Sequence, residues 1–165
     1  MEIAGEVGSL ITQGLTRSNL RCASCNGVRA KSIGIEKGID QINSGDVDKL
    51  DLKLFKQLLS NQTTPIVSPI AYDRNGRPLR INSDLLASEL AAKIEATKLI
   101  YMTTENGIRE KGQALKNLPV AELELYLKNN SRLIKERLIS KARHSAKAVR
   151  MGLSLIHISE PTRPY

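Results

Sequence analysis

The stretch from residue 64 to residue 108 constrains the fold more than any other part of this 165-residue chain. Ile66 and Val67 form a short apolar run behind Pro65, which is typical of a buried strand. The run Asp-Arg-Asn-Gly at residues 73–76 is a turn signal between two extended pieces. A turn of this kind between extended segments predicts a small β-hairpin directly after the strand.

A helix and a second strand follow the hairpin. Asn82, Ser83 and Asp84 offer an N-cap to a helix. Its apolar residues at helical spacing are Leu85, Leu86, Leu90 and Ile94. Residues 99–102 predict another buried strand, and a strand, a helix and a strand together predict an α/β fold built on a parallel sheet. Because such sheets bind ligands at the carboxyl ends of their strands, Asn82 and Asp84 lie in a candidate binding loop.

These features resemble the amino acid kinase family, and within it two groups of arginine biosynthesis. The N-acetylglutamate kinases carry a similar proline-led strand, a hairpin, an N-A-D step into a helix and a strand that ends in S-D-x-x-G. The chain has Asn-Ser-Asp at residues 82–84 and Thr-Thr-Glu-Asn-Gly at residues 103–107 in those places. Residues 33–47 are more similar to the kinase-like domain of the N-acetylglutamate synthases, whose pattern is G-V-x-x-G-V-D, a short gap and G-x-V.

The resemblance covers residues 2–152 and implies a fold. That fold is an α/β, parallel-sheet-based sandwich of the amino-acid kinase, or carbamate kinase-like, type. No glycine-rich phosphate loop precedes the helix-like apolar run that begins at Ile3. The first βα units of the family fold are therefore expected to be missing, and we expect residues 1–152 to form a domain that is incomplete at both ends.

The same resemblance implies site residues. Asp84 matches the aspartate that organises the kinase site, and Asn82 matches a substrate-binding asparagine of the same step. Lys141 matches a lysine that steadies charge on the transferred phosphoryl group. From the residues alone, Asp84 is also suited to cap the helix, and Lys141 is also suited to be one more solvated lysine.

Three departures from the kinase pattern favour the synthase group. Arg80 stands where the kinases have a second substrate-binding asparagine, and Thr104 stands where they have an aspartate. The glycine-rich phosphate loops are absent from the sequence. Arg80 puts a bulky cation at the substrate-binding position, so the chain is more similar to the kinase-like regulatory domain, which does not transfer phosphate.

The resemblance therefore implies a piece of an N-acetylglutamate synthase, which acetylates L-glutamate with acetyl-CoA in the first step of arginine biosynthesis. The acetyltransferase domain would follow residue 152, so we expect this piece to be inactive and to bind neither acetyl-CoA nor another cofactor. We expect the parent protein to be a cytoplasmic homo-oligomer that binds glutamate or N-acetylglutamate and responds to arginine. Two other interpretations stay open: an ATP-dependent N-acetylglutamate kinase, and a non-enzymatic α/β module that binds an anionic partner.

The last thirteen residues, 153–165, are a separate feature of the chain. The run LSLIHISEPTR at residues 153–163 resembles the in-frame translation of a common transposon-derived sequencing adapter. Such a segment is excluded from fold reasoning, so we expect residues 153–165 not to be native. The stretch at residues 155–158 is nevertheless apolar and β-branched, which would suit a strand.

The net charge of +8 depends largely on a basic run between residues 132 and 150. On a helix, the core-facing stripe would be Ile134, Leu138, Ala142, Ser145 and Val149. The basic residues then cover the other faces, but no aromatic residue is interleaved for base stacking, which disfavours nucleic acid as a partner. No apolar run approaches the length of a membrane span. The polar residues 43–45 predict a loop.

Cys22 and Cys25 form a lone C-x-x-C pair. A zinc site needs about four ligands, and the only histidines are His144 and His157. A redox pair would lie at the start of a helix, whereas this pair precedes a predicted strand at residues 28–33. We therefore expect a structural role for the cysteines and no metal site.

Overall fold

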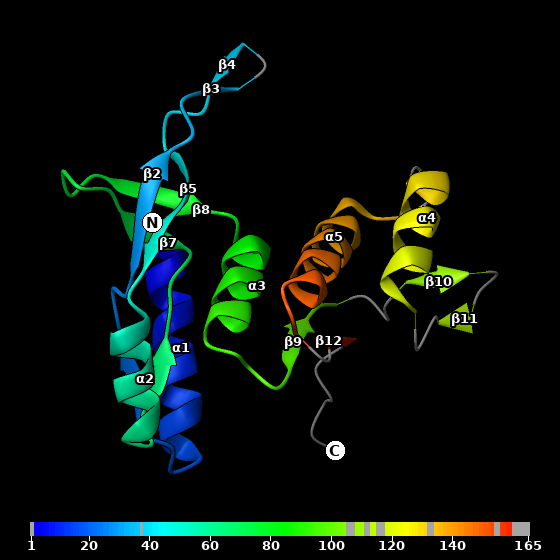
Figure 1. The fold of residues 1–165 in the computed structure, drawn as a ribbon. Helices are drawn as coiled ribbons and strands as arrows, with labels where there is room; N and C mark the ends of the chain where they lie inside the picture. Colours follow the sequence, from blue (N-terminus) through cyan, green and yellow to red (C-terminus); the bar gives the residue numbers. More distant parts are fainter. Residues whose placement is uncertain are drawn as a thin grey trace. The chain divides into compact units, whose positions relative to one another are not determined.

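The structure is a computed structural model that describes residues 2–36, 38–104, 108–110, 113–114, 118–131, 134–153 and 156–159. The chain divides into two compact units, Met1–Leu86 and Ala87–Tyr165 (Figure 1).

The first unit opens with helix α1, Glu2–Arg17, as the apolar spacing from Ile3 predicts. Strand β1, Cys22–Ser24, pairs in parallel with β6, Thr64–Ile66. The strand predicted around Ile66 is therefore confirmed, although it ends before Val67 and is only partly buried. Helix α2, Leu52–Ser60, leads into β6. Asp51 caps α2 by accepting a hydrogen bond from the Leu54 backbone N–H at 3.0 Å.

The core of the first unit is a small closed barrel with the strand order β2-β5-β8-β7. Its strands are β2 Val28–Ser32, β5 Ser44–Leu50, β7 Ile70–Tyr72 and β8 Pro78–Ile81. The predicted hairpin is confirmed as the antiparallel β7–β8 pair, whose turn includes Gly76 at a φ of +78°. β2 and β5 are antiparallel, whereas β5–β8 and β2–β7 are parallel. Leu79 and Ile81 fill the interior.

The loop predicted at residues 43–45 is wrong, because β5 begins at Ser44. Gly45 is buried in this strand beneath Leu79 and the Lys31 carbonyl. A Cβ atom at Gly45 would lie 2.8 Å from Leu79 Cβ, so the glycine provides space for a neighbouring strand and does not mark a turn. A second hairpin, β3 Ile35–Glu36 with β4 Ile39–Asp40, extends beyond the barrel (Figure 1).

Helix α3, Ser83–Lys93, begins at the end of the first unit and continues into the second. The other helices that the structure describes in the second unit are α4 Val120–Asn130 and α5 Glu136–Arg150. Its strands are β9 Leu99–Met102, β10 Arg109–Glu110, β11 Gln113–Ala114 and β12 Ile156–Ser159. β10 and β11 form an antiparallel pair, and β12 runs parallel to β9.

Small apolar residues hold the second unit together. Ala91, Ala148 and Leu153 form one buried cluster. Ile108, Leu127 and Ala142 form another. The stripe predicted on α5 is confirmed at Leu138, Ala142 and Ser145, which are buried, while Val149 is partly buried.

Strand β9 differs from its prediction as a buried strand. Only Tyr101 is buried, whereas Ile100 and Met102 are 54% and 57% exposed. Each of the two strands predicted to flank α3 pairs in parallel with a strand of its own unit, β6 with β1 and β9 with β12. None of the helices in the described part of the chain combines the length and apolar composition that crossing a membrane requires.

Candidate functional site

Arg80 lies in β8, Asn82 joins β8 to α3, and Asp84 lies in the first turn of α3. Ile81 is buried at 2% exposure, so Arg80 and Asn82, on either side of it, leave the opposite face of the strand and are exposed. The strand is held on both edges, because the Arg80 N–H donates to the Asn43 carbonyl at 2.7 Å and the Ile81 N–H donates to the Pro69 carbonyl at 2.8 Å. Arg80 and Asn82 are therefore two exposed polar residues at the carboxyl end of β8.

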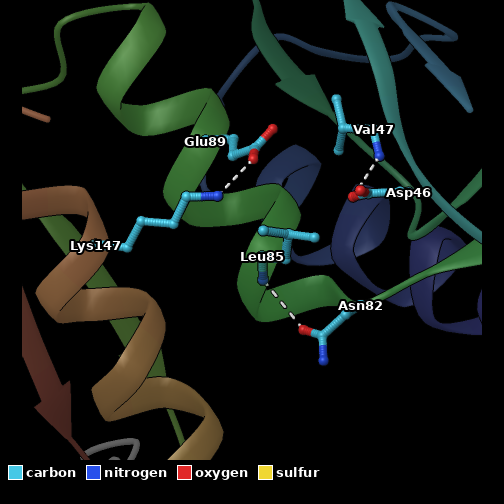
Figure 2. A network of polar contacts seen from close by, with 6 residues as sticks. All are labelled: Asp46, Val47, Asn82, Leu85, Glu89 and Lys147. Carbon is cyan, nitrogen blue, oxygen red and sulfur yellow. Dashed lines mark hydrogen bonds and ion pairs between the residues drawn. The ribbon is translucent and has the colours of Figure 1, made fainter. Parts of the chain in front are cut away.

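Asn82 is the N-cap of α3 (Figure 2). Its Oδ1 accepts hydrogen bonds from the backbone N–H groups of Asp84 at 2.9 Å and Leu85 at 3.1 Å. The capping role that the residue pattern also allowed for Asp84 therefore belongs to Asn82. Because Oδ1 is committed to the helix, the Asn82 side chain offers its Nδ2 group, a donor, to a ligand.

Asp84 lies in the first turn of α3 and is buried, with 8% of its surface exposed. A carboxylate in the first turn interacts favourably with the positive end of the helix dipole. Asp84 therefore adds a buried carboxylate to the start of α3.

Lys141 belongs to α5 and is half-buried. Its Nζ lies over the ring of Tyr101, 5.3 Å from the ring centroid, which is a cation–π contact. The sequence pattern did not identify Tyr101 on β9 as a candidate site residue. The feature that could have indicated it is an aromatic side chain with a polar end inside an otherwise aliphatic strand. The structure thus brings Arg80, Asn82 and Asp84 together, whereas Lys141 belongs to the second unit, which is described separately.

The basic face of α5 is partly neutralised within its own unit. The Lys147 ammonium contacts Glu89 of α3 at 2.9 Å (Figure 2). Arg150 contacts Glu124 of α4 at 2.6 Å. Charges that are already paired attract phosphate weakly, so the geometry disfavours α5 as a nucleic-acid face.

A cavity of about 1010 Å³ in the first unit lies against α1. Its lining is mainly apolar and includes Val7, Ile11, Val28, Leu58, Ile66 and Ile70, with Cys25 and Asn26 among the polar contributors. Neither Arg80, Asn82 nor Asp84 lines this cavity. It is therefore separate from the β8–α3 step.

The remaining candidate residues from the sequence are the strand-end motif and the cysteine pair. Residues 105–107 of the predicted strand-end motif lie outside the described residues. Cys22 opens β1 and Cys25 follows it, and both are free, half-buried thiols. The described part of the chain contains no group of three His, Cys, Asp or Glu residues that could hold a metal ion.

The family model described as the amino acid kinase family matches residues 2–159. The chain belongs to this family. The match confirms the expected fold class, a parallel-sheet-based α/β architecture of the amino-acid kinase type. It also extends into residues 153–159, so it does not test the adapter origin that the sequence predicts for them.

The similar proteins include acetylglutamate kinases and an N-acetylglutamate synthase. Acetylglutamate kinase of Methanospirillum hungatei is 30% identical over 173 aligned positions, which cover 96% of this chain and 58% of that protein. Among solved structures, the N-acetylglutamate synthase of Neisseria gonorrhoeae with coenzyme A and N-acetyl-glutamate superimposes with a TM-score of 0.87 at 21% identity. That superposition covers 96% of this chain and 37% of the synthase. The same synthase with coenzyme A and L-arginine gives a TM-score of 0.79 at 20% identity over 86% of this chain and 32% of the synthase.

The chain spans about half the length of the curated relatives it matches. At these identities the likeness to the synthase structures concerns the fold, and the sequence relatives carry the kinase name. The family is enzymatic, and the similar proteins named above are acetylglutamate kinase and N-acetylglutamate synthase.

Proposed function

We propose that this chain is the kinase-like, regulatory part of an N-acetylglutamate synthase. The observation that carries the proposal is Arg80. It is exposed at the carboxyl end of β8, at the position where the kinase resemblance has a small substrate-binding asparagine. A guanidinium attracts carboxylates and phosphates but cannot reproduce the paired donor and acceptor of an amide.

The contact between Lys141 and Tyr101 supports the same proposal. Stabilising a transferred phosphoryl group requires a cation that is held toward the phosphate oxygens. The Lys141 ammonium instead lies over an aromatic ring that is itself 5% exposed. A ligand phosphate would have to compete with that ring for the ammonium.

The ligands that follow from this proposal are small carboxylates. Glutamate or N-acetylglutamate would be held by Arg80 and by the Nδ2 donor of Asn82, with Asp84 fixing the start of α3 beneath them. Arginine would be the effector of the full protein, a cytoplasmic homo-oligomer. Acetyl transfer from acetyl-CoA would take place in a separate domain, so we propose that residues 1–165 alone have no acetyltransferase activity.

An N-acetylglutamate kinase is the second candidate. It is favoured by the 30% identity to an acetylglutamate kinase across 96% of this chain. The Asn-Ser-Asp step into α3 and the position of Lys141 on α5 are compatible with it.

Assays of the purified chain separate the candidates. With ATP and N-acetylglutamate, and with acetyl-CoA and glutamate, we expect only background turnover. ATP-dependent phosphorylation that is abolished by both Asp84→Asn and Lys141→Met would overturn the proposal in favour of the kinase. The matched control is Lys147→Met, which removes a cation from the same helix at a position paired with Glu89.

We also propose that residues 153–165 are encoded by adapter sequence and that the domain proper comprises residues 1–152. Sequencing the locus from unfragmented DNA tests this origin. Recovery of the same codons within continuous genomic sequence would contradict it.

A further inference from the structure

Helix α1 carries more apolar surface than its packing within the first unit uses. It packs on β1 and β6, and its partly buried residues, Ala4, Gly8 and Leu15, share one face at helical spacing. A helix on the surface of a domain needs one apolar stripe of this kind to join the core. A second apolar stripe on the same helix is therefore available for another contact.

The second stripe of α1 is exposed. Ile3, Val7 and Leu10 follow one another at four- and three-residue spacing, so they lie on one side of the helix. They are 75%, 49% and 64% exposed. Gly14 continues the same row, and nothing lies within 4 Å of a Cβ atom placed there. Large aliphatic side chains that are exposed in a row, and not singly, indicate an interaction surface.

The hydroxyl groups of α1 do not make this helix more polar. Thr12 Oγ1 donates to the Gly8 carbonyl at 2.9 Å, and Thr16 Oγ1 donates to the Thr12 carbonyl at 2.8 Å. Just after the helix, Ser18 Oγ donates to the Gly14 carbonyl at 3.1 Å. Because these protons are bonded to the backbone of the helix itself, the hydroxyl groups depend less on water. The surface of α1 is thus less polar than its sequence suggests.

The charges of α1 select the orientation of a partner helix. Glu6 lies in the first half of the helix and Arg17 in its last turn, and both are exposed. A second α1 in the antiparallel direction brings unlike charges to the same end, whereas a parallel one brings like charges together. Antiparallel helices also place the positive end of one helix dipole beside the negative end of the other. The charges of this helix are therefore complementary to those of an antiparallel copy.

We propose that the exposed stripe of α1 is the contact between two copies of this chain, packed antiparallel about a two-fold axis. Such a contact uses the same surface of each copy. Val7 of one copy then lies beside Leu10 of the other, and Ile3 enters the open space at Gly14. The inference deepens the homo-oligomer proposed above by naming its contact. Its test measures association and not turnover, so its failure is distinguishable from a failure of the proposed activity.

Analytical ultracentrifugation of the full chain over a range of concentrations tests the proposal. We expect an equilibrium between monomer and dimer that stops at two copies. Leu10→Arg places a charge in the contact from both sides and should weaken the dimer by about tenfold or more. Circular dichroism should show an unchanged fold, because Leu10 is exposed within one copy. The matched control is Leu59→Arg on α2, at 46% exposure, which should leave the dimer unchanged.

Reversing the charges tests the direction of the two helices. Glu6→Arg and Arg17→Glu should each weaken the dimer about fivefold, because like charges then meet at both ends. An equimolar mixture of the two variants should dimerise as the natural chain does, since every pair between copies is again of unlike charges. Full association of either variant alone, or no association of the mixture, would overturn the antiparallel contact.

The position of the contact has its own contrary outcomes. A chain that stays monomeric at all concentrations would show that a second copy does not occupy the stripe. Association that continues beyond two copies would show non-specific apolar adhesion. An equal weakening by Leu10→Arg and Leu59→Arg would place the contact elsewhere, so each of these results would overturn the proposal.

Discussion

Positive charge is arranged in opposite ways on helix α5 and on the β2–β5 ladder. On α5, Lys147 contacts Glu89 and Arg150 contacts Glu124. On the ladder, Arg29 lies opposite Lys49, and neither forms an ion pair within the described part of its unit. The helix carries much of the basic run, yet two of its cations are paired with acids, whereas the ladder places two cations opposite each other.

The difference shows that the number of charges in a segment is a poor guide to a binding site. Long side chains on a helix surface can reach acids of neighbouring helices, as Lys147 and Arg150 do. Cross-strand register fixes which residues face each other, so a one-residue bulge at Asp48 decides which charges meet. Charge pairing, and not charge density, therefore distinguishes the two regions.

The largest expected effect comes from disturbing the frame of the ladder. Gly45→Val introduces side-chain atoms where a Cβ would already lie 2.8 Å from Leu79 Cβ and 3.1 Å from the Lys31 carbonyl oxygen. Overpacking of this kind destabilises by about 1–3 kcal/mol, so the thermal unfolding midpoint should fall by several degrees. Circular dichroism melting measures the change.

The control for this substitution is Gly8→Ala, in helix α1. Nothing lies within 4 Å of a Cβ placed at Gly8, so alanine meets no obstacle there. Alanine in a helix interior is favoured over glycine by about 0.5–1 kcal/mol, and the midpoint should rise. A Gly45→Val protein as stable as the natural chain would contradict the close approach of β5 and β8.

Removing the cap at the β8–α3 step should have a moderate effect. Asn82→Ala leaves the backbone N–H groups of Asp84 and Leu85 without their acceptor. Loss of an N-cap costs about 1 kcal/mol, measured by chemical denaturation. Asn82→Asp retains an acceptor and should restore most of the stability, whereas a similar loss in both variants would argue that the cap is unimportant.

The smallest effect, and the sharpest test of the comparison, concerns salt. Glu89→Gln should destabilise by about 0.2–1 kcal/mol, because the pair with Lys147 is partly exposed. Raising the salt concentration from about 0.05 M to about 0.5 M screens attraction on α5 and repulsion on the ladder. Amide hydrogen exchange should therefore accelerate in α5 and slow in β2 and β5; a change of the same sign in both would break the comparison.

The sequence pattern predicted the elements whose signals are local. The Asp-Arg-Asn-Gly turn correctly indicated the β7–β8 hairpin, because turn geometry depends on a few adjacent residues. The start of α3 was predicted equally well, since capping residues lie within one helical turn. The choice of Asn82 over Asp84 as the cap could not be made, because both types are good N-caps.

Features that depend on distant neighbours escaped prediction. Gly45 belongs to a strand because Leu79 occupies the space beside it, and that contact joins residues far apart in the sequence. Tyr101 holds Lys141 through a contact between β9 and α5, and a periodicity argument treats such an aromatic as core. The pairing of Arg29 with Lys49 depends on a bulge that residue types alone do not indicate.

Strand β12 shows that parallel pairing places few requirements on the sequence of the added strand. It is held beside β9 through backbone register, and Ile156 packs on the cluster of Ala91, Ala148 and Leu153. Any short peptide with a β-branched apolar residue in that position would meet both requirements. If the adapter origin of this segment holds, a peptide with no selective history has been accepted as secondary structure. Read-through of a stop codon or a frameshift adds such peptides to proteins in living cells. A strand with an unpaired edge is therefore a place where a protein can gain a new element of secondary structure before selection acts on it.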